Sequence, residues 1–186
     1  MKITVNEDIC LGFSHCGSVS ATAKGEFDMP DEYVETLVAL IRERGTADIE
    51  ELQLAELHPE IYEFLNKNLN EIYNIAEEAH FIRRGFYMDD CYEYDDEFIA
   101  YCESECGFVY SEGNDTKEFR NISGSSKFKY ITCFLNWLCE YVDTLTDQEL
   151  IDFFYEHINN GFNYSPSEYE IEIPQQIIDL VHESGE

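Results

Sequence analysis

Alternation of apolar and polar residues marks the start of the chain. Over residues 3–13 the odd positions are largely apolar and the even positions largely polar, a period-two pattern that predicts a strand with one buried face. Turn residues fill 14–17, and a second alternating run covers 19–29, where Gly25 is predicted to form a β-bulge. Together the two runs predict an antiparallel hairpin.

Helical spacing replaces this alternation after the hairpin. Pro30 occupies a favoured first helical position and Gly45 a favoured end, so a helix is predicted between them. The longest apolar stripe begins at His58 and predicts a helix that continues to about Arg84. Gly85 is expected to end that helix, because glycine is common just beyond a helix C-terminus.

The last third of the chain predicts two more helices and a strand before its final helix. Residues 128–142 are apolar nearly all round, which predicts a central buried helix that holds the only tryptophan. Thr146 and Glu149 have the spacing of a capping box and begin the next helix. Alternation returns at 169–173 and predicts a strand, after which Pro174 opens the last helix.

These elements predict an α+β fold. If the strand at 169–173 joins the N-terminal hairpin, one small antiparallel or mixed sheet packs against several helices. Between the helices, 107–110 predicts a short strand and 111–126 a polar, glycine-bearing loop. A length of 186 residues suits a single domain over 1–186, and 86–126 is interpreted as an acidic, loop-rich insertion.

Charge changes the picture more than any motif does. Forty Asp and Glu against 11 Lys and Arg give a net charge of −29, while a hydrophobic fraction of 44% favours a folded protein. There is no Lys or Arg between Arg84 and Lys117, and none after Lys129. Such a field repels nucleic acid and anionic membranes and attracts basic proteins. The alternative is that the acidity serves solubility alone.

The segment 87–106 is the strongest candidate for a binding surface. It mixes acids with tyrosines and has no Lys, Arg or His. Acids alone predict a solvated face, whereas tyrosine adds rigid amphipathic contact area, so the mixture favours a positively charged protein partner. The predicted partner-binding residues are Asp89, Asp90, Tyr92, Glu93, Tyr94, Asp95, Asp96, Glu97, Tyr101, Glu103 and Glu105.

The cysteines indicate the compartment and argue against a metal site. Their number, seven, is odd, and the chain opens on a strand pattern without the apolar run of a secretory signal. Both features predict free thiols in a cytoplasmic protein, and no apolar run reaches the length of a membrane span. The Cys102/Cys106 and Cys133/Cys139 spacings differ from the Cys-x-x-Cys of zinc sites, so buried apolar roles are expected.

The acids at 89–97 do not make a calcium loop either, because the run lacks the glycine and the twelfth-position glutamate of an EF-hand. Phosphate-binding, nucleotide-binding and hydrolase motifs are absent from the sequence. His15 and Cys16 are adjacent in the predicted turn, and an inert interpretation is preferred over a thiol site. We therefore predict no catalytic residue, metal or cofactor.

The sequence favours a non-enzymatic acidic protein that binds a basic partner. One form of this function is a nucleic-acid-mimicking inhibitor of a DNA- or RNA-handling protein, such as a host defence nuclease. Acids three or four residues apart on a helix lie roughly 5 to 6 Å from each other, comparable with successive phosphates. The alternatives are a carboxylate-based or divalent-metal enzyme and an acidic accessory subunit. No resemblance to a known family emerges, and the oligomeric state stays open.

Overall fold

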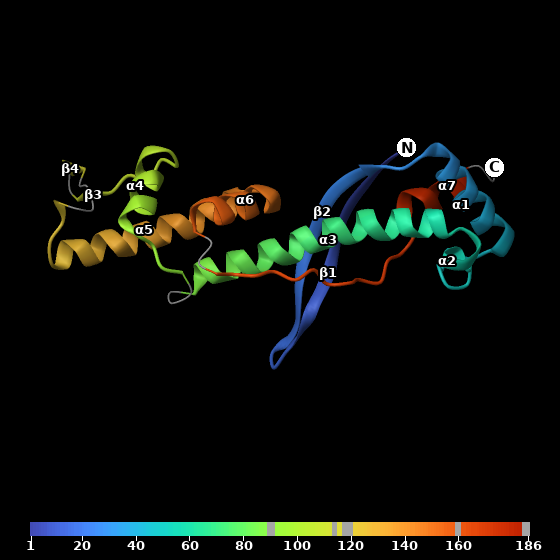
Figure 1. Ribbon diagram of the computed structural model, residues 1–186, viewed down its shortest axis with the longest axis horizontal. Coiled ribbons are helices and arrows are strands. Elements are labelled where there is room, and N and C mark those ends of the chain that lie inside the picture. Colours follow the sequence, from blue (N-terminus) through green and yellow to red (C-terminus); the bar gives the residue numbers. More distant parts are fainter. Residues whose placement is uncertain (89–91, 113–114, 117–120, 159–160, 184–186) are drawn as a thin grey trace. The chain divides into compact units, whose positions relative to one another are not determined.

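The computed structural model describes residues 1–88, 92–112, 115–116, 121–158 and 161–183 (Figure 1). The chain forms two compact units: unit 1 comprises Met1–Glu77 and Ser165–Glu186, and unit 2 comprises Glu78–Tyr164. An antiparallel two-stranded sheet together with helices α1 to α7 confirms the predicted α+β class. The predicted single domain with an insertion at 86–126 stays a prediction.

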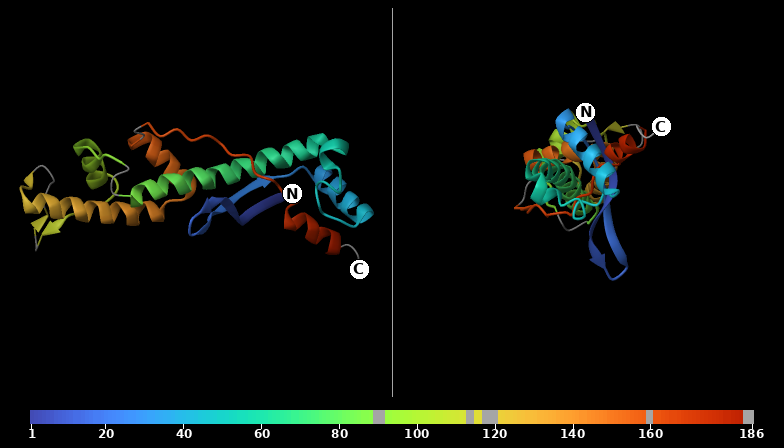
Figure 2. Two further views of the ribbon diagram at one scale, coloured as in Figure 1. Left: turned by 90° about the horizontal axis from the view of Figure 1, so that it is seen from below. Right: turned by 90° about the vertical axis from the view of Figure 1, so that its right-hand side faces the viewer.

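The N-terminal hairpin of unit 1 is confirmed. Strand β1 (Lys2–Ser14) pairs antiparallel with β2 (Gly17–Asp28), and Figures 1 and 2 show its turn end projecting away from the long helix. The register shifts between Cys10 and Gly12, so the bulge lies in β1. The predicted bulge at Gly25 is wrong, because Gly25 pairs regularly with Val5.

Gly25 is required for close packing instead. A Cβ atom at this position would lie 2.8 Å from Cγ1 of Ile72 on helix α3 (Pro59–Tyr87). Real Cβ atoms essentially never come so close to another heavy atom, so the missing side chain lets the hairpin lie directly against the helix.

A Gly25→Ala substitution is therefore expected to lower the free energy of unfolding by about 1–3 kcal/mol through overpacking. Ile72→Ala alone leaves a cavity and costs about 2–5 kcal/mol. In the double variant, the Ile72 atoms that the new methyl group would meet are gone. Its loss of unfolding free energy should therefore be smaller than the sum of the two single losses by at least about 1 kcal/mol. Urea unfolding of the four proteins measures this coupling, and additive effects would contradict the packing argument.

Unit 1 continues with α1 (Asp31–Arg44), α2 (Leu54–Leu57), the first part of α3, and α7 (Gln175–Glu183). The helix predicted between Pro30 and Gly45 is confirmed as α1. Gly45 follows it with a φ of 72°, in the left-handed region that glycine adopts readily. The predicted final helix after Pro174 is confirmed as α7.

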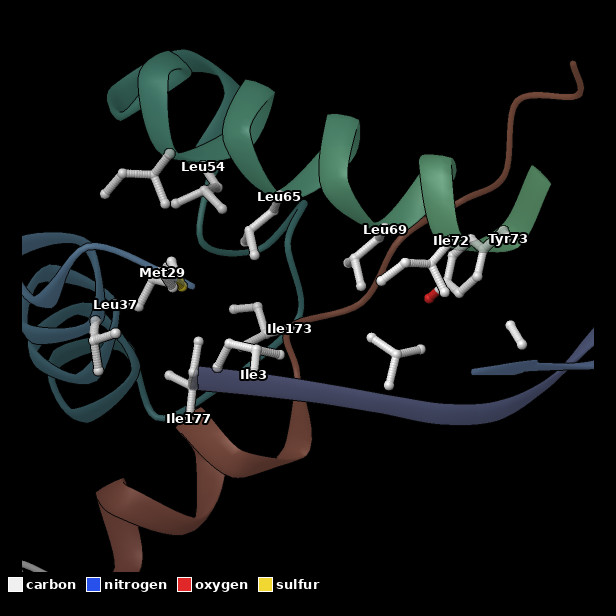
Figure 3. Close-up of a cluster of buried hydrophobic side chains, with 14 of the residues drawn as sticks. Ile3, Met29, Leu37, Leu54, Leu65, Leu69, Ile72, Tyr73, Ile173 and Ile177 are labelled. Atoms are coloured by element: carbon white, nitrogen blue, oxygen red, sulfur yellow. The ribbon is translucent and has the colours of Figure 1, made fainter. Parts of the chain in front are cut away.

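The core of unit 1 lies between the hairpin and these helices. Ile3 of β1, Leu65 of α3 and Ile177 of α7 belong to one cluster and are each 0% exposed, and Figure 3 shows their side chains converging. The outward residues of β1, such as Thr4 and Asn6, are exposed. The predicted strand with one buried face is thus present.

Helix α3 runs past its predicted end. It continues through Gly85 to Tyr87, so the expected stop at Gly85 is wrong. A Cβ atom on Gly85 would lie 2.2 Å from Oη of Tyr92. This glycine therefore admits an aromatic ring against the helix instead of ending it.

The predicted C-terminal strand does not join the sheet. In the described residues the hairpin sheet contains β1 and β2 alone, and residues 161–174 have no strand assignment. Side chains of α3 bind the backbone of this segment, and they take the place of a neighbouring strand. The expected third strand is therefore wrong, although the helix after it is correct.

Unit 2 contains the end of α3, α4 (Asp96–Ser104), α5 (Ser125–Thr144) and α6 (Asp147–His157), with a small pair of strands, β3 (Ser111–Glu112) and β4 (Asp115–Thr116). The short strand predicted at 107–110 is wrong. That segment is irregular and buries Phe108 and Tyr110, whose rings contact Tyr130. The loop predicted at 111–126 includes β3 and β4, and 113–114 and 117–120 lie outside the described residues.

Helix α5 is less buried than predicted. Its buried side chains form one stripe at i, i+4 spacing: Tyr130, Phe134, Leu138 and Val142. Trp137 is only partly buried and Phe128 is 74% exposed, so the prediction of burial nearly all round is wrong. The predicted capping box is confirmed: Thr146 accepts from the Glu149 backbone while the Glu149 carboxylate accepts from Thr146.

Candidate functional site

In the predicted partner-binding stretch, tyrosines pack inward. The Tyr92 hydroxyl donates to the Ile82 carbonyl at 3.2 Å. Tyr94 stacks on Phe98, and Tyr101 stacks on the His157 ring with centroids 3.9 Å apart. These three tyrosines are partly buried, so much of their surface is engaged within unit 2 and less is left for a partner.

The acids of the same stretch mostly point outward. Asp95 caps helix α4 by accepting a hydrogen bond from the Phe98 amide at 2.8 Å. Glu103 is partly buried and accepts a hydrogen bond from the Tyr130 hydroxyl. Asp89 and Asp90 lie outside the described residues. The exposed acids are Glu93, Asp95, Asp96, Glu97 and Glu105.

A second acidic surface, in unit 1, is hollowed. A groove of about 700 Å³ lies between residues 7–13 of the hairpin, Tyr73 and Glu77 of α3, and the extended segment 167–172. None of the described residues that line it is Lys, Arg or His. We call it the acidic groove, and its carboxylates are Glu7, Asp8, Glu77, Glu168, Glu170 and Glu172.

Buried polar groups form one wall of the acidic groove. Glu77 is only 6% exposed and accepts a hydrogen bond from the Ser167 hydroxyl at 2.9 Å. The Tyr169 hydroxyl is buried beside them, and no described residue meets it at hydrogen-bond geometry. The Tyr73 hydroxyl donates to the Glu7 carboxylate.

The two tyrosines of this wall remain protonated at neutral pH. Burial, followed by the hydrogen bond to Glu7, raises the pKa of Tyr73. Burial, followed by the neighbouring Glu77, raises the pKa of Tyr169. Each hydroxyl can therefore act as a hydrogen-bond donor beside a carboxylate.

Two asparagines of α3 hold the segment that carries Ser167 and Tyr169 in place. Asn70 donates to the Tyr169 carbonyl at 3.3 Å and accepts from the Tyr169 amide at 2.7 Å. Asn74 donates to the Ser167 carbonyl at 3.0 Å and accepts from the Ser167 amide at 2.8 Å. Side chains four residues apart on the helix thus bind alternate residues of an extended segment. We call these four hydrogen bonds the asparagine clamp.

Potential metal ligands and cysteines were the other candidates for a site. The described part of the chain contains no group of three or more His, Cys, Asp or Glu side chains arranged to hold a metal ion. Among the described residues, no disulfide joins the cysteines Cys10, Cys16, Cys102, Cys106, Cys133 and Cys139, and Cys91 lies outside the described residues. Cys102 is buried as predicted, which raises the pKa of its thiol. Cys133 is exposed, contrary to the expected buried role.

No protein family, curated protein or solved structure matches the chain in the three comparisons made. None of the helices in the described part of the chain combines the length and apolar character that a membrane span requires.

Sequence reasoning identified the acidic stretch of unit 2 and missed the acidic groove. Two signals for the groove were visible. Asn66, Asn70 and Asn74 recur every fourth residue on the predicted long helix, which places amide side chains along one face. Glu168, Glu170 and Glu172 alternate with less polar residues and so share one side of an extended segment.

Proposed function

We propose that the protein is a non-enzymatic binding protein that holds a basic protein partner in its acidic groove. The observation that carries this proposal is the groove itself, where three separate segments bring six carboxylates together without a cationic lining residue. Electrostatic complementarity of this kind selects a positively charged partner and speeds its association.

The distribution of charge supports the proposal. Glu77 is the one buried charged residue in the described part of the chain, so the negative charge is carried almost entirely on the surface. Arg83 pairs with Asp143 and Asp147, and Lys2 pairs with Glu26. Eleven Lys and Arg cannot neutralise 40 acids, and the remaining field acts on any approaching basic protein.

A nucleic-acid-binding protein is the partner class that fits best. Glu168, Glu170 and Glu172 are exposed on an extended segment, where alternate residues lie about 6.6 Å apart. They form a regular row of negative charge, as phosphates do along a nucleic-acid strand. We also infer a cytoplasmic location, and the lack of a disulfide among the described cysteines supports it.

Competition with duplex DNA and RNA tests this function. Purified basic proteins that bind DNA or RNA are loaded with labelled nucleic acid, and the acidic protein is titrated in at near-physiological salt. We expect it to displace nucleic acid from at least one of them, and the displacement should weaken as salt rises. If no protein of the panel releases its nucleic acid, the nucleic-acid-binding partner class is rejected.

Two charge-matched variants show which surface acts. One carries Glu168→Gln, Glu170→Gln and Glu172→Gln in the acidic groove, and the other carries Glu93→Gln, Glu97→Gln and Glu105→Gln in the stretch predicted from sequence. All six residues are exposed, so neither change should unfold the protein. The groove variant is expected to require about tenfold more protein for displacement. Equal losses would indicate a general charge effect instead of a site.

A further inference from the structure

Strand β1 has an open edge along the acidic groove. The Met1 amine donates to the Met29 carbonyl and the Met29 amide donates to the Met1 carbonyl, both at 2.7 Å. In an antiparallel ladder such hydrogen-bonded pairs alternate with pairs whose backbone groups point away from the partner strand. With the regular register as far as Cys10, the even-numbered residues of β1 direct their N–H and C=O groups away from β2.

The first part of this edge already binds a polar group. The Thr4 amide donates to Oε1 of Gln176, at the start of α7, at 3.2 Å. This bond confirms that even-numbered residues face outward. For the next outward residues, Asn6 and Asp8, the described part of the chain supplies no partner to the backbone amide. Unpaired strand edges of this kind are templates for another strand.

Space for another strand exists beside this edge. The acidic groove is lined by Asp8 and Cys10 on the β1 side and by residues 167–172 on the other. A second hollow, of about 480 Å³, continues along Thr4 and Asn6. The two hollows share Glu7 and Glu172 as lining residues. The asparagine clamp holds segment 167–172 on α3, which keeps the place beside β1 vacant.

The charge of the groove decides what can enter. Six carboxylates line it, so an extended peptide with lysine or arginine would gain from complementarity. A second copy of this chain would bring Glu7 and Asp8 of its own β1 against the same acids. Like charges directly opposite one another on paired strands are destabilising.

We propose that an extended basic segment of the partner enters the acidic groove and pairs with the open edge of β1 as a third strand of the sheet. This inference rests on the proposed function and specifies its mode: backbone hydrogen bonds to Asn6 and Asp8 supply register and affinity, and the groove carboxylates select cationic side chains. The position expected for a strand of this chain is thus filled by a strand of its partner.

A synthetic peptide on the unmodified protein provides the first test. The probe is a capped peptide of about eight residues in which lysine alternates with valine or threonine. Two derivatives carry N-methyl groups on every second backbone nitrogen, one in each phase. The derivative whose methylated nitrogens face β1 loses hydrogen bonds to that strand and is expected to bind at least about tenfold more weakly than the unmethylated peptide. The derivative methylated in the other phase is expected to bind within about threefold of the unmethylated peptide. Equal binding of all three peptides would overturn strand pairing.

Amide hydrogen exchange locates the contact. Without peptide, the amides of Asn6 and Asp8 should exchange faster than those of Val5 and Glu7, which face β2. With peptide bound, exchange at Asn6 and Asp8 should slow by at least about tenfold. Protection confined to other parts of the protein would overturn the proposal.

Two proline variants address the edge from the protein side. Asn6→Pro removes an amide that points away from β2, so no hydrogen bond within the hairpin is lost. Ser20→Pro is the control, because it removes an amide that points away from β1 on the opposite edge of the hairpin. Peptide affinity should fall at least about tenfold for Asn6→Pro and less than about twofold for Ser20→Pro. If Asn6→Pro fails to fold, the N-methylated peptides decide the matter on the unmodified protein.

The outcomes separate the two proposals. Displacement of nucleic acid without binding of any extended peptide would overturn the third strand and leave the proposed function standing. Binding of the peptides in the predicted phase, with no displacement from any basic protein, would support the strand mode and reject the nucleic-acid-binding partner class.

Discussion

The double substitution Asn70→Ala with Asn74→Ala is expected to lower the free energy of unfolding by about 2–4 kcal/mol. The asparagine clamp contributes four hydrogen bonds between these side chains and the backbone of Ser167 and Tyr169. A typical intramolecular hydrogen bond contributes about 0.5–1.5 kcal/mol net, and more is lost when a buried partner is left unsatisfied. Few other double substitutions on α3 should cost so much without removing apolar surface.

Asn68→Ala is the matched control for this variant. Asn68 lies on the same helix, but its side chain donates only to the Phe64 carbonyl one turn earlier, so its loss should cost less than about 0.5 kcal/mol. Urea unfolding measures the difference, and hydrogen exchange should show faster exchange at the Ser167 and Tyr169 amides. Equal stability of the double variant and Asn68→Ala would contradict the role of the asparagine clamp in holding segment 167–172.

The clamp explains why part of the fold could be predicted and part could not. The hairpin was predictable because its two alternating runs are adjacent and need no information from elsewhere in the chain. The alternation at 169–173 was equally clear, but an extended segment can satisfy its backbone against a strand or against side chains. Segment 167–172 binds side chains because Asn70 and Asn74 lie about a hundred residues earlier in the chain. The local pattern of apolar and polar residues at 169–173 carries no information about these asparagines.

Glycine and proline signals show the same division. Pro30 and Gly45 bound α1 as expected, because helix ends depend on local backbone preference. Gly85 has the same local signal but lies inside α3, where it admits the Tyr92 ring. Gly25 likewise faces Ile72 instead of forming a bulge. A glycine needed for close approach cannot be distinguished by local sequence from one that ends or kinks an element.

Charge was predictable for the candidate site, but its geometry was not. Composition alone established that a negative field exists, and it favoured the acid and tyrosine stretch where both residue types are dense. The fold directs the rings of Tyr92 and Tyr94 into unit 2. It assembles the acidic groove from Glu7, Glu77 and Glu172, which are far apart in sequence, and only tertiary structure brings such residues together.

Alkaline pH is expected to unfold the protein cooperatively between about pH 10 and 12. Burial is the largest cause of a raised pKa at a series of tyrosines. The pKa rises to about 12 at Tyr87, Tyr101, Tyr141 and Tyr155, and it also rises at Tyr73, Tyr130 and Tyr169. Hydrogen bonds to carboxylates contribute further, as between Tyr130 and Glu103.

The sign of the effect follows from proton binding in the two states. A tyrosine in the unfolded chain loses its proton near pH 10, whereas these tyrosines keep theirs in the folded protein. Their contribution to stability is therefore complete below pH 10 and is lost as pH rises toward the folded pKa. For the buried Tyr73 and Tyr130, 5% and 0% exposed, the loss over two pH units is about 2–3 kcal/mol each. Two such losses consume much of a typical stability of about 5–15 kcal/mol.

Tyrosinate absorbance and far-ultraviolet circular dichroism, followed together against pH, measure this transition. Because ionisation of the buried Tyr73 and Tyr130 requires unfolding, part of the rise in tyrosinate absorbance should coincide with the loss of helical signal. Tyr130→Phe removes one linked proton, so its transition should be less steep in pH. A rise in absorbance centred near pH 10 for all thirteen tyrosines, with the helical signal unchanged, would show that their hydroxyls are not held protonated by the fold.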